Sequence, residues 1–407
     1  SKLKSFLRRR IEVFEIHQTP KRKNFFGLVL GTFSLFIIAS AAYGAQQSLR
    51  SNESVKPNNG IATFDPLIQK TTEKILSKYI KKFDAKGGFV IIVDSRNGKV
   101  LASVNQRNQK NRAEKNWALS YRLEPASVMK GIVVASALEE KVTTPNEELN
   151  CESGKYSYGG HLYQDWKPFK NLTTSEAIQK SSNICGIKIG QKLGSKKISD
   201  SLKDFGFGNS GSTSEFPEAM AGQIPQPSQL SEPDYIALIT TGYTGAPGFY
   251  VTPLEVVMAY AAIANEGRLM KPILSSEPDS SVKFMKQVIS PETSKQMKVI
   301  LSDTVKKGTG TNAQSRLYTT AGKTSTAFRP EPSENILVGG ERGIAGFAGL
   351  APVENSRLAV YVGIIDPMNT TKGDPHGNTH AAPVFREVIE KVLQQMNVSP
   401  DKSLSPE

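Results

Sequence analysis

Histidine and cysteine are scarce in this sequence of 407 residues, which contains four histidines and two cysteines. The histidines are His17, His161, His376 and His380. None lies in a recognisable catalytic triad or metal motif, so the sequence gives little support to histidine-dependent hydrolysis. His376 and His380 have a spacing that would suit a metal ion on a helix, but the glycine and proline residues around them predict a polar loop.

The two cysteines, Cys151 and Cys185, are too few for a disulfide framework or for a zinc site of the usual four-ligand kind. They can form one bridge in an oxidising compartment, and this bridge would tether the helix that follows Ser181. They can equally be two separate small buried residues. The sequence leaves both interpretations open.

Long basic runs and interleaved aromatic and basic residues are also lacking, which argues against nucleic-acid binding. The formal net charge is +13, and residues 1–45 supply +6 of it through eight Lys or Arg and two Glu. The remaining +7 is spread along the chain. This balance favours a location near polyanionic surfaces such as lipid headgroups or cell-wall polymers.

Residues 25–45 form a run of 21 residues without a charge. A helix of about 20 apolar residues spans the roughly 30 Å hydrocarbon core of a bilayer. Because basic residues precede the run, the positive-inside rule predicts a cytoplasmic tail over 1–24, a transmembrane helix over 25–45 and the rest of the chain outside the cytoplasm. Small residues at 39–41 and 42–44 resemble signal-peptide cleavage sites, but the length of the apolar run favours an uncleaved anchor.

The rest of the chain predicts a polar linker over 46–62, one large domain over 63–395 and a disordered tail over 396–407. Helical periodicity is found over 64–83, 253–264 and 381–393, and Thr252 is the expected cap of the second of these helices. Strand patterns are found over 88–94, 99–104, 318–327, 343–350 and 357–365. Two early and three late strands with helices between them predict one antiparallel sheet built from both ends of the domain.

Ser127 and Lys130 lie at the start of an apolar helical stretch and form the first catalytic pattern. Three positions apart on a helix, their side chains share one face and can meet. A serine hydroxyl needs a base to become a good nucleophile, and a lysine whose pKa is lowered by burial and neighbouring cations can be that base. The start of the helix also supplies a backbone N–H near Ser127 that can stabilise an oxyanion.

Two further patterns follow at wide spacing, Ser181-Ser-Asn183 at the start of a helix and Lys323-Thr-Ser-Thr326 on a strand. Their order and spacing resemble the three signatures of penicillin-binding proteins and serine β-lactamases. The surrounding sequence resembles class B penicillin-binding proteins over roughly residues 64–395. The segments that carry this resemblance are 124–127, 179–183, 251–254, 259–267, 321–324, 346–352 and 381–385.

The resemblance implies a mixed α/β transpeptidase fold, in which helices cover a five-stranded antiparallel sheet and a helical subdomain holds Ser181, preceded by one transmembrane helix. It also implies a peptidoglycan D,D-transpeptidase that cross-links stem peptides through an acyl-enzyme. Ser127 would be the nucleophile and Lys130 its general base. Ser181 would relay a proton to the leaving amine, and Asn183 would hold both the donor peptide and Lys130.

The same resemblance assigns substrate binding to the third signature. Lys323 would contribute positive charge, the hydroxyls of Thr324 and Thr326 would hold the terminal carboxylate, and the Thr326 backbone N–H would complete the oxyanion hole. Neither a metal nor an organic cofactor is implied. The implied partners are peptidoglycan stem peptides, β-lactams bound covalently at Ser127 and a membrane glycan polymerase. The implied location is the bacterial cytoplasmic membrane, with the catalytic domain in the periplasm or outside the cell.

Two features depart from the family pattern. Ser325, which we include among the substrate-binding residues, stands where the third signature normally has glycine. A glycine there permits close approach of a ligand backbone, so Ser325→Gly is expected to speed acylation by penicillins unless serine is simply a tolerated small residue. The second feature is that only about forty residues separate Ala45 from Gly88. This length leaves no room for the pedestal domain of the family and predicts an active site close to the membrane.

Two other functions remain open. A D,D-carboxypeptidase or β-lactamase would use the same residues, although Glu215 and Glu218 lack the surroundings expected of a deacylating glutamate. A β-lactam sensor or a weakly catalytic cell-wall-binding scaffold is favoured by Ser325, but it is opposed by the complete set of the other signature residues. Asp165-Trp166, between the first two signatures, is interpreted as a structural turn, and a place beside the bound donor peptide is the alternative.

Overall fold

The computed structural model describes residues 64–107, 116–209, 216, 219–243, 248–327, 343–368 and 376–402, which belong to the unit that begins at Ala62. The predicted cytoplasmic tail (1–24), transmembrane helix (25–45) and linker (46–62) lie outside these residues, as do Glu215 and Glu218. Within the described ranges, no helix combines the length and the hydropathy needed to cross a bilayer.

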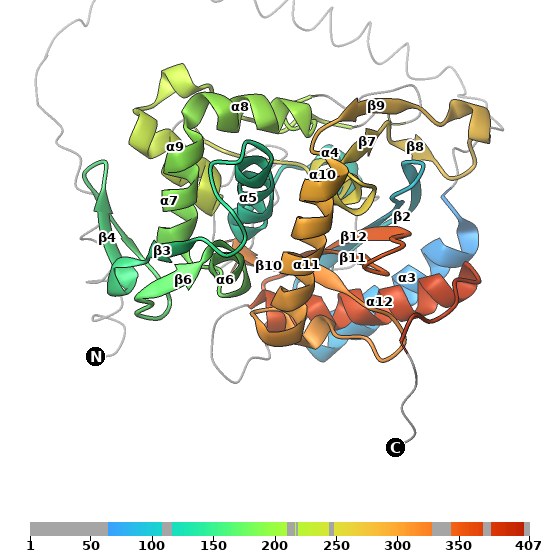
Figure 1. Ribbon diagram of the computed structural model, residues 1–407. Helices are drawn as coiled ribbons and strands as arrows, with labels where there is room; N and C mark the ends of the chain where they lie inside the picture. Colours follow the sequence, from blue (N-terminus) through green and yellow to red (C-terminus); the bar gives the residue numbers. More distant parts are fainter. Residues whose placement is uncertain are drawn as a thin grey trace, which may run out of the picture. The chain divides into compact units, whose positions relative to one another are not determined.

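The central sheet is built from both ends of the described chain, as predicted (Figure 1). Its strands, in spatial order, are β10 (Ala321–Ala327), β11 (Ile344–Ala351), β12 (Leu358–Ile365), β1 (Gly87–Asp94), β2 (Lys99–Arg107) and β8 (Ile273–Leu274). The first five are antiparallel, which confirms the predicted five-stranded arrangement. The prediction omitted β8, which pairs in parallel with the start of β2, because a strand of two residues leaves no periodic pattern to detect.

The central strand β1 joins the two halves of the sheet because it pairs with β2 on one side and with β12 on the other. All eight of its residues are buried, as expected for a strand covered on both faces. Phe89 lies opposite Gly363 in the register, and a Cβ atom at Gly363 would come 2.2 Å from the Phe89 ring. The glycine therefore makes room for the ring at the sheet surface.

Helices cover both faces of the sheet. On one face, α3 (Pro66–Lys82) and α12 (Ala382–Gln395) lie side by side (Figure 1) and share a core with Val90 and Ile92 of β1. On the other face, α10 (Pro253–Ala264) packs on the same strand, and α5 (Met129–Glu139) and α11 (Pro291–Lys307) belong to the core cluster that includes the alternate side chains of β1. The helices predicted over 64–83, 253–264 and 381–393 are confirmed as α3, α10 and α12. Thr252 caps α10, since its hydroxyl accepts the Glu255 N–H and the Glu255 carboxylate accepts the Thr252 N–H.

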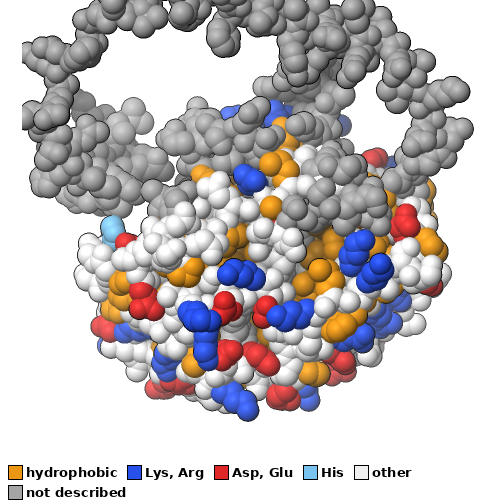
Figure 2. All heavy atoms as spheres, turned by 90° about the horizontal axis from the view of Figure 1, so that it is seen from above, with side chains coloured by type: hydrophobic (Ala, Val, Ile, Leu, Met, Phe, Trp, Pro, Cys, Tyr) orange, Lys and Arg blue, Asp and Glu red, His pale blue; other side chains and the backbone are white. Residues whose placement is uncertain are grey.

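A helical region flanks α5 and completes the described part of the chain. Its helices are α6 (Thr174–Gln179), α7 (Asn183–Leu193), α8 (Ser195–Asp204) and α9 (Glu232–Thr241), and a short helix α4 (Trp117–Ser120) precedes α5. The small sheets pair β3 (Glu148–Asn150) with β6 (Asn171–Thr173), β4 (Lys155–Tyr158) with β5 (His161–Gln164), and β7 (Arg268–Met270) with β9 (Phe284–Gln287). The face seen in Figure 2 carries acidic and basic side chains interspersed, so the two signs of charge are not segregated there.

The edge of β2 beyond β8 is covered by the first turn of α3 and by Asp65, which precedes it. The side-chain amide of Gln69 donates to the Ser103 carbonyl at 3.2 Å and accepts the Ser103 N–H at 3.1 Å. The Asp65 N–H donates to the Leu101 carbonyl at 2.9 Å. These contacts occupy backbone groups that an edge strand would otherwise leave unpaired.

The structure corrects two predictions near the carboxyl end. The tail over 396–407 was expected to be disordered, but in its described part, 396–402, the Val398 carbonyl accepts the Tyr318 hydroxyl at 2.7 Å and the Asp401 carboxylate accepts the Thr319 N–H at 2.7 Å. These contacts also explain why β10 begins at Ala321 rather than at Tyr318. Continued pairing would place Thr319 opposite Pro352, which has no N–H to donate to the ladder.

The segment around the last two histidines also differs from its prediction. Residues Gly377–Ala381 form a π-helical turn rather than a polar loop, and His380 is buried against Phe83. The π-helical turn depends on tertiary packing, so it could not be predicted from the glycine and proline pattern alone. Among the described residues, no three His, Cys, Asp or Glu side chains group closely enough to hold a metal ion.

Candidate active site

Ser127 lies in a 3₁₀ turn, Ala126–Val128, which continues directly into α5. Ala126 has a positive φ of 50°, a sparsely populated conformation for a residue with a side chain. The Ala126 N–H donates to the Gly242 carbonyl at 2.7 Å, and a Cβ atom at Gly242 would come 2.1 Å from the Ala126 carbonyl oxygen. The close approach of Gly242 at the end of α9 therefore supports a strained turn at the predicted nucleophile.

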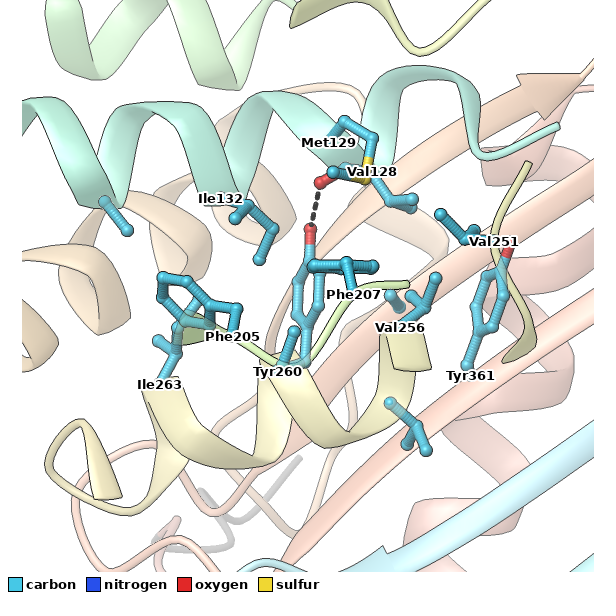
Figure 3. Close-up of a cluster of buried hydrophobic side chains, with 14 of the residues drawn as sticks. Val128, Met129, Ile132, Phe205, Phe207, Val251, Val256, Tyr260, Ile263 and Tyr361 are labelled. Atoms are coloured by element: carbon cyan, nitrogen blue, oxygen red, sulfur yellow. Dashed lines mark hydrogen bonds between the residues drawn. The ribbon is translucent and has the colours of Figure 1, made fainter. Parts of the chain in front are cut away.

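Tyr260 of α10 supports the same turn from the sheet side. Its hydroxyl donates to the Val128 carbonyl at 3.0 Å, as Figure 3 shows. Both residues are fully buried, so the bond forms away from competing water. Gly242 and Tyr260 could not be identified from the sequence, because their role depends on how α9 and α10 pack against the turn that precedes α5.

Lys130 contacts the predicted nucleophile directly. Its Nζ atom lies 2.8 Å from Ser127 Oγ and 2.7 Å from Asn183 Oδ1. The side chain is 0% exposed. Burial lowers the pKa of Lys130 to about 7, although the Asp165 carboxylate acts in the opposite direction. A substantial fraction of Lys130 is therefore a neutral amine near neutral pH, and the neutral amine can accept a proton from a serine.

The second and third signatures meet through Ser181 and Lys323. Ser181 lies in the turn between α6 and α7 with a positive φ of 56°, and its Oγ accepts a hydrogen bond from Lys323 Nζ at 2.8 Å. Lys323 is fully buried on β10, and Lys130 is close enough to influence its charge. Burial lowers the pKa of Lys323 well below its usual range, and the neighbouring Lys130 ammonium lowers it further.

The five residues predicted to be catalytic are therefore brought together from distant parts of the chain. The Lys130–Asn183 contact spans 53 positions and the Lys323–Ser181 contact spans 142. Ser127, Lys130 and Asn183 form one hydrogen-bonded group, while Ser181 and Lys323 form a second group beside it. This arrangement can activate a serine without histidine, because an amine of suitable pKa is held against the hydroxyl.

The residues predicted to bind substrate lie on β10, the outermost strand of the sheet on this side. Thr324 is buried, and its hydroxyl donates to the Thr309 hydroxyl at 3.0 Å. Thr326 is partly exposed on the same strand. Because β10 has a strand partner on one side alone within the described sheet, its other side can present backbone N–H and C=O groups to an extended ligand.

Ser325 points across the sheet and away from the outer edge of β10. A Cβ atom on its register partner Gly346 would come 2.2 Å from Ser325 Oγ, so the hydroxymethyl group lies over that glycine. Beyond it, Ser325 hydrogen-bonds with Tyr361 of β12. Ser325 is 5% exposed and Tyr361 is buried. The side chain is therefore turned towards β11 and β12 and is held there by Tyr361.

We therefore expect Ser325→Gly to change stability more than acylation. Removing the hydroxyl leaves the buried Tyr361 without this partner, which should lower the free energy of unfolding by about 1–2 kcal/mol in urea titrations. Tyr361→Phe should cost a similar amount, and the double variant should lose less than the sum of the two single losses. The second-order rate of acylation by benzylpenicillin should stay within about threefold of wild type. A clear acceleration would instead support the expectation drawn from the sequence.

Cys151 and Cys185 form a disulfide, which resolves the two alternatives that the sequence left open. Cys151 follows β3, and Cys185 lies in the first turn of α7, two residues after Asn183. Their Cα atoms are 5.2 Å apart and 34 positions apart in sequence. The bridge therefore ties the start of the helix that carries Asn183 to the small β3–β6 sheet.

Asp165 and Trp166 lie next to the second signature. Asp165 accepts hydrogen bonds from the start of α7, and the Trp166 indole N–H donates to the Lys180 carbonyl at 2.7 Å. The sequence interpretation of a structural turn is therefore incomplete for Asp165. The position of the pair between two signatures is the signal that could have identified it.

Comparisons with known proteins agree with this geometry. The family model for the penicillin-binding protein transpeptidase domain matches residues 88–390. The chain is 28% identical over 395 residues to Stage V sporulation protein D of Bacillus subtilis, covering 89% of this chain and 58% of that protein. It is 29% identical over 376 residues to peptidoglycan D,D-transpeptidase FtsI of Escherichia coli, covering 90% and 61%. The chain thus spans about three fifths of the length of these two relatives.

Two further similarities cover most of both partners. The probable peptidoglycan D,D-transpeptidase PenA of Neisseria flavescens is 30% identical over 377 residues, covering 88% of each chain. The apo structure of the TP domain from Burkholderia pseudomallei penicillin-binding protein 3 superposes with a TM-score of 0.74 at 30% identity, covering 84% of this chain and 97% of that one. The resemblance to class B penicillin-binding proteins is confirmed, and this chain belongs to the penicillin-binding protein transpeptidase family.

Proposed function

We propose that this chain is a serine-type peptidoglycan D,D-transpeptidase that uses Ser127 as its nucleophile. The observation that carries the proposal is the buried Lys130 amine, which lies 2.8 Å from Ser127 Oγ and has a pKa lowered to about 7. The names of the relatives, which include peptidoglycan D,D-transpeptidases, support the same reaction. No step requires a metal or an organic cofactor.

The first half of the reaction forms an ester on Ser127. Neutral Lys130 takes the Ser127 proton while Oγ attacks the carbonyl carbon of the penultimate D-Ala of a stem peptide. The backbone N–H groups of Ser127 and Thr326 stabilise the oxyanion that develops. The proton that Lys130 received passes through the Ser181 hydroxyl to the nitrogen of the terminal D-Ala, the amide bond breaks, and D-Ala leaves, so that Lys130 is neutral again. Lys323, which donates to Ser181 Oγ in the structure, keeps that hydroxyl oriented.

The second half transfers the acyl group to another stem peptide. The acceptor amine attacks the ester carbonyl, its proton passes to Lys130 or Ser181, and the Ser127 oxygen leaves and is reprotonated. Thr324 and Thr326 hold the carboxylate of the donor through their hydroxyls during the first half. A carboxylate that arrives beside Lys323 stabilises its protonated form, so Lys323 contributes positive charge when the donor is bound.

The test is acylation of the wild-type protein by benzylpenicillin, followed by intact-protein mass spectrometry at a series of pH values. We expect a stable adduct of one drug mass, because a transpeptidase excludes water from its acyl-enzyme. A peptide that ends in D-Ala-D-Ala, mixed with an amine acceptor, should release D-Ala and give the cross-linked product. Consumption of the drug without an adduct would indicate a hydrolase, and absence of both would indicate a binding scaffold or sensor.

The rate of acylation should depend on pH through Lys130. The residue is protonated and inactive as a base below its pKa of about 7, and neutral above it. The second-order rate should therefore rise about tenfold for each pH unit below this value and level off above it. A rate that is flat or that falls across this range would show that a neutral Lys130 is not the base.

We also propose that residues 25–45 anchor the enzyme in the bacterial cytoplasmic membrane, with the catalytic domain on the outer side. The support is the uncharged run of 21 residues and the basic residues that precede it. A membrane glycan polymerase is the proposed partner, because cross-linking needs nascent glycan strands close to the active site.

A further inference from the structure

Asp165, the residue that follows β5, contacts the start of α7 at three points. Its Oδ1 accepts the Asn183 N–H at 2.5 Å and the Ile184 N–H at 3.3 Å. Its Oδ2 accepts the Ser182 hydroxyl at 2.6 Å. A carboxylate in this position is favoured by the unpaired N–H groups and by the positive end of the helix dipole.

Capping alone does not account for these contacts, because α7 already has an N-cap. Ser182 Oγ accepts the Cys185 N–H at 3.0 Å, which is the usual bond of a capping serine. The Asp165 carboxylate in turn accepts hydrogen bonds from the Ser182 hydroxyl and from the backbone N–H of Asn183. It therefore fixes the backbone of the residue that contacts Lys130.

The neighbouring residue fixes the side chain of Asn183. Its Nδ2 donates to the Gln164 carbonyl at 3.0 Å, so the amide is oriented with Oδ1 towards Lys130 Nζ. A neutral amine has two N–H donors and one lone pair. When Asn183 Oδ1 accepts one of the N–H groups, the lone pair can be directed to the proton of Ser127. Residues 164 and 165 together set the geometry on which the base depends.

The negative charge of the Asp165 carboxylate also acts on the Lys130 amine. Among the described residues, the charged group that acts on Lys130 is the Asp165 carboxylate, and the charged group that acts on Lys323 is Lys130. Burial lowers the pKa of Lys130 and Asp165 raises it. The carboxylate therefore opposes the loss of the Lys130 proton while it holds the partner that orients the amine.

We propose that Asp165 is a positioning residue for acylation, which holds Asn183 so that Lys130 is aimed at Ser127 and which places a negative charge beside that pair. The proposal rests on the proposed function of Ser127 and Lys130. It goes beyond that function by giving the end of β5 a role in the chemistry, although the hydrogen bonds of Asp165 go to the start of α7 and not to the nucleophile.

The experiment compares Asp165→Asn, Asp165→Ala and the control Asp65→Asn by second-order acylation with benzylpenicillin from about pH 5 to 9. Asp65 is a matched control because its carboxylate also accepts two backbone N–H groups, at the start of α3. Asp165→Ala should lower the plateau rate about tenfold or more, since the base loses its orientation. Asp165→Asn keeps the size and one carbonyl acceptor, and it should move the rising limb to lower pH by about half a unit or more.

A merely structural role would lower stability in both Asn variants and leave the midpoint of the pH profile unchanged, and that result would overturn the proposal. If Asp165→Ala does not fold, as judged by its far-ultraviolet spectrum and melting temperature, Asp165→Asn alone decides the question. Absence of an adduct on the wild-type protein would instead reject the proposed function. The two failures are therefore distinguishable.

Discussion

Replacing Ser127 by alanine is expected to abolish the benzylpenicillin adduct and to lower D-Ala release from a stem peptide at least about a thousandfold. The change removes the oxygen that forms the ester and leaves the base in place, since Lys130 Nζ keeps its contact with Asn183 Oδ1. The turn at Ala126 is held by Gly242 and Tyr260 rather than by the serine hydroxyl, so the fold should persist. Intact-protein mass spectrometry and quantification of released D-Ala measure the two effects.

Ser136→Ala is the matched control for this prediction. Ser136 is buried in the same helix, and its hydroxyl donates to the Ile132 carbonyl within that helix. Its removal should leave the adduct and the acylation rate unchanged, with a small loss of stability at most. An adduct of one drug mass on the Ser127→Ala protein would mean that another group is acylated, and the proposed mechanism would then be wrong.

Removing the disulfide is expected to lower the free energy of unfolding by about 3–4 kcal/mol in the Cys151→Ala/Cys185→Ala variant. The bridge closes a loop between residues 34 positions apart, so its absence gives the unfolded chain more conformational freedom. Urea unfolding of the wild type and the double variant measures the difference. The start of α7 should be the most affected part of the fold, and hydrogen exchange of the backbone amides at positions 185 and 186 should reveal faster local opening.

Reduction of the wild-type protein is the control that removes the bridge and keeps both sulfur atoms. It should produce most of the same destabilisation, whereas the double variant should be insensitive to the reductant. Labelling of both thiols in unreduced, denatured wild-type protein would show that the bridge does not form. In that case the two proteins should unfold at similar urea concentrations.

The candidate catalytic residues could be proposed from the sequence because each signature is local. Ser127 and Lys130 are one helical turn apart, and Ser181 and Asn183 surround the start of a single helix, so short segments carry the pattern. The family resemblance supplied the order in which these segments meet. Long apolar strands such as β1 and β12 were predicted for the same reason, since eight consecutive residues give a clear signal.

The parts that could not be predicted depend on contacts between segments distant in sequence. The orientation of Ser325 towards Tyr361 follows from the pairing of β10, β11 and β12, which no single strand reports. Asp165 contacts Asn183 because the β4–β5 hairpin folds back on α7, and its residues alone suggest a turn. The strand β8 has two residues, too few for any pattern.

The contrast between the two ends of the sheet limits what can associate with it. At the β2 end, the side-chain amide of Gln69 forms the two hydrogen bonds, with the N–H and the carbonyl of Ser103, that a neighbouring strand would otherwise form. An extended peptide that approaches this part of β2 finds the backbone groups of Ser103 and the Leu101 carbonyl already occupied. At the β10 end, the outer backbone groups lie beside Lys323 and Ser127. The molecule therefore discourages edge-to-edge stacking of its own copies at one end, while the other end remains able to recruit the extended tail of a peptide as a temporary extra strand.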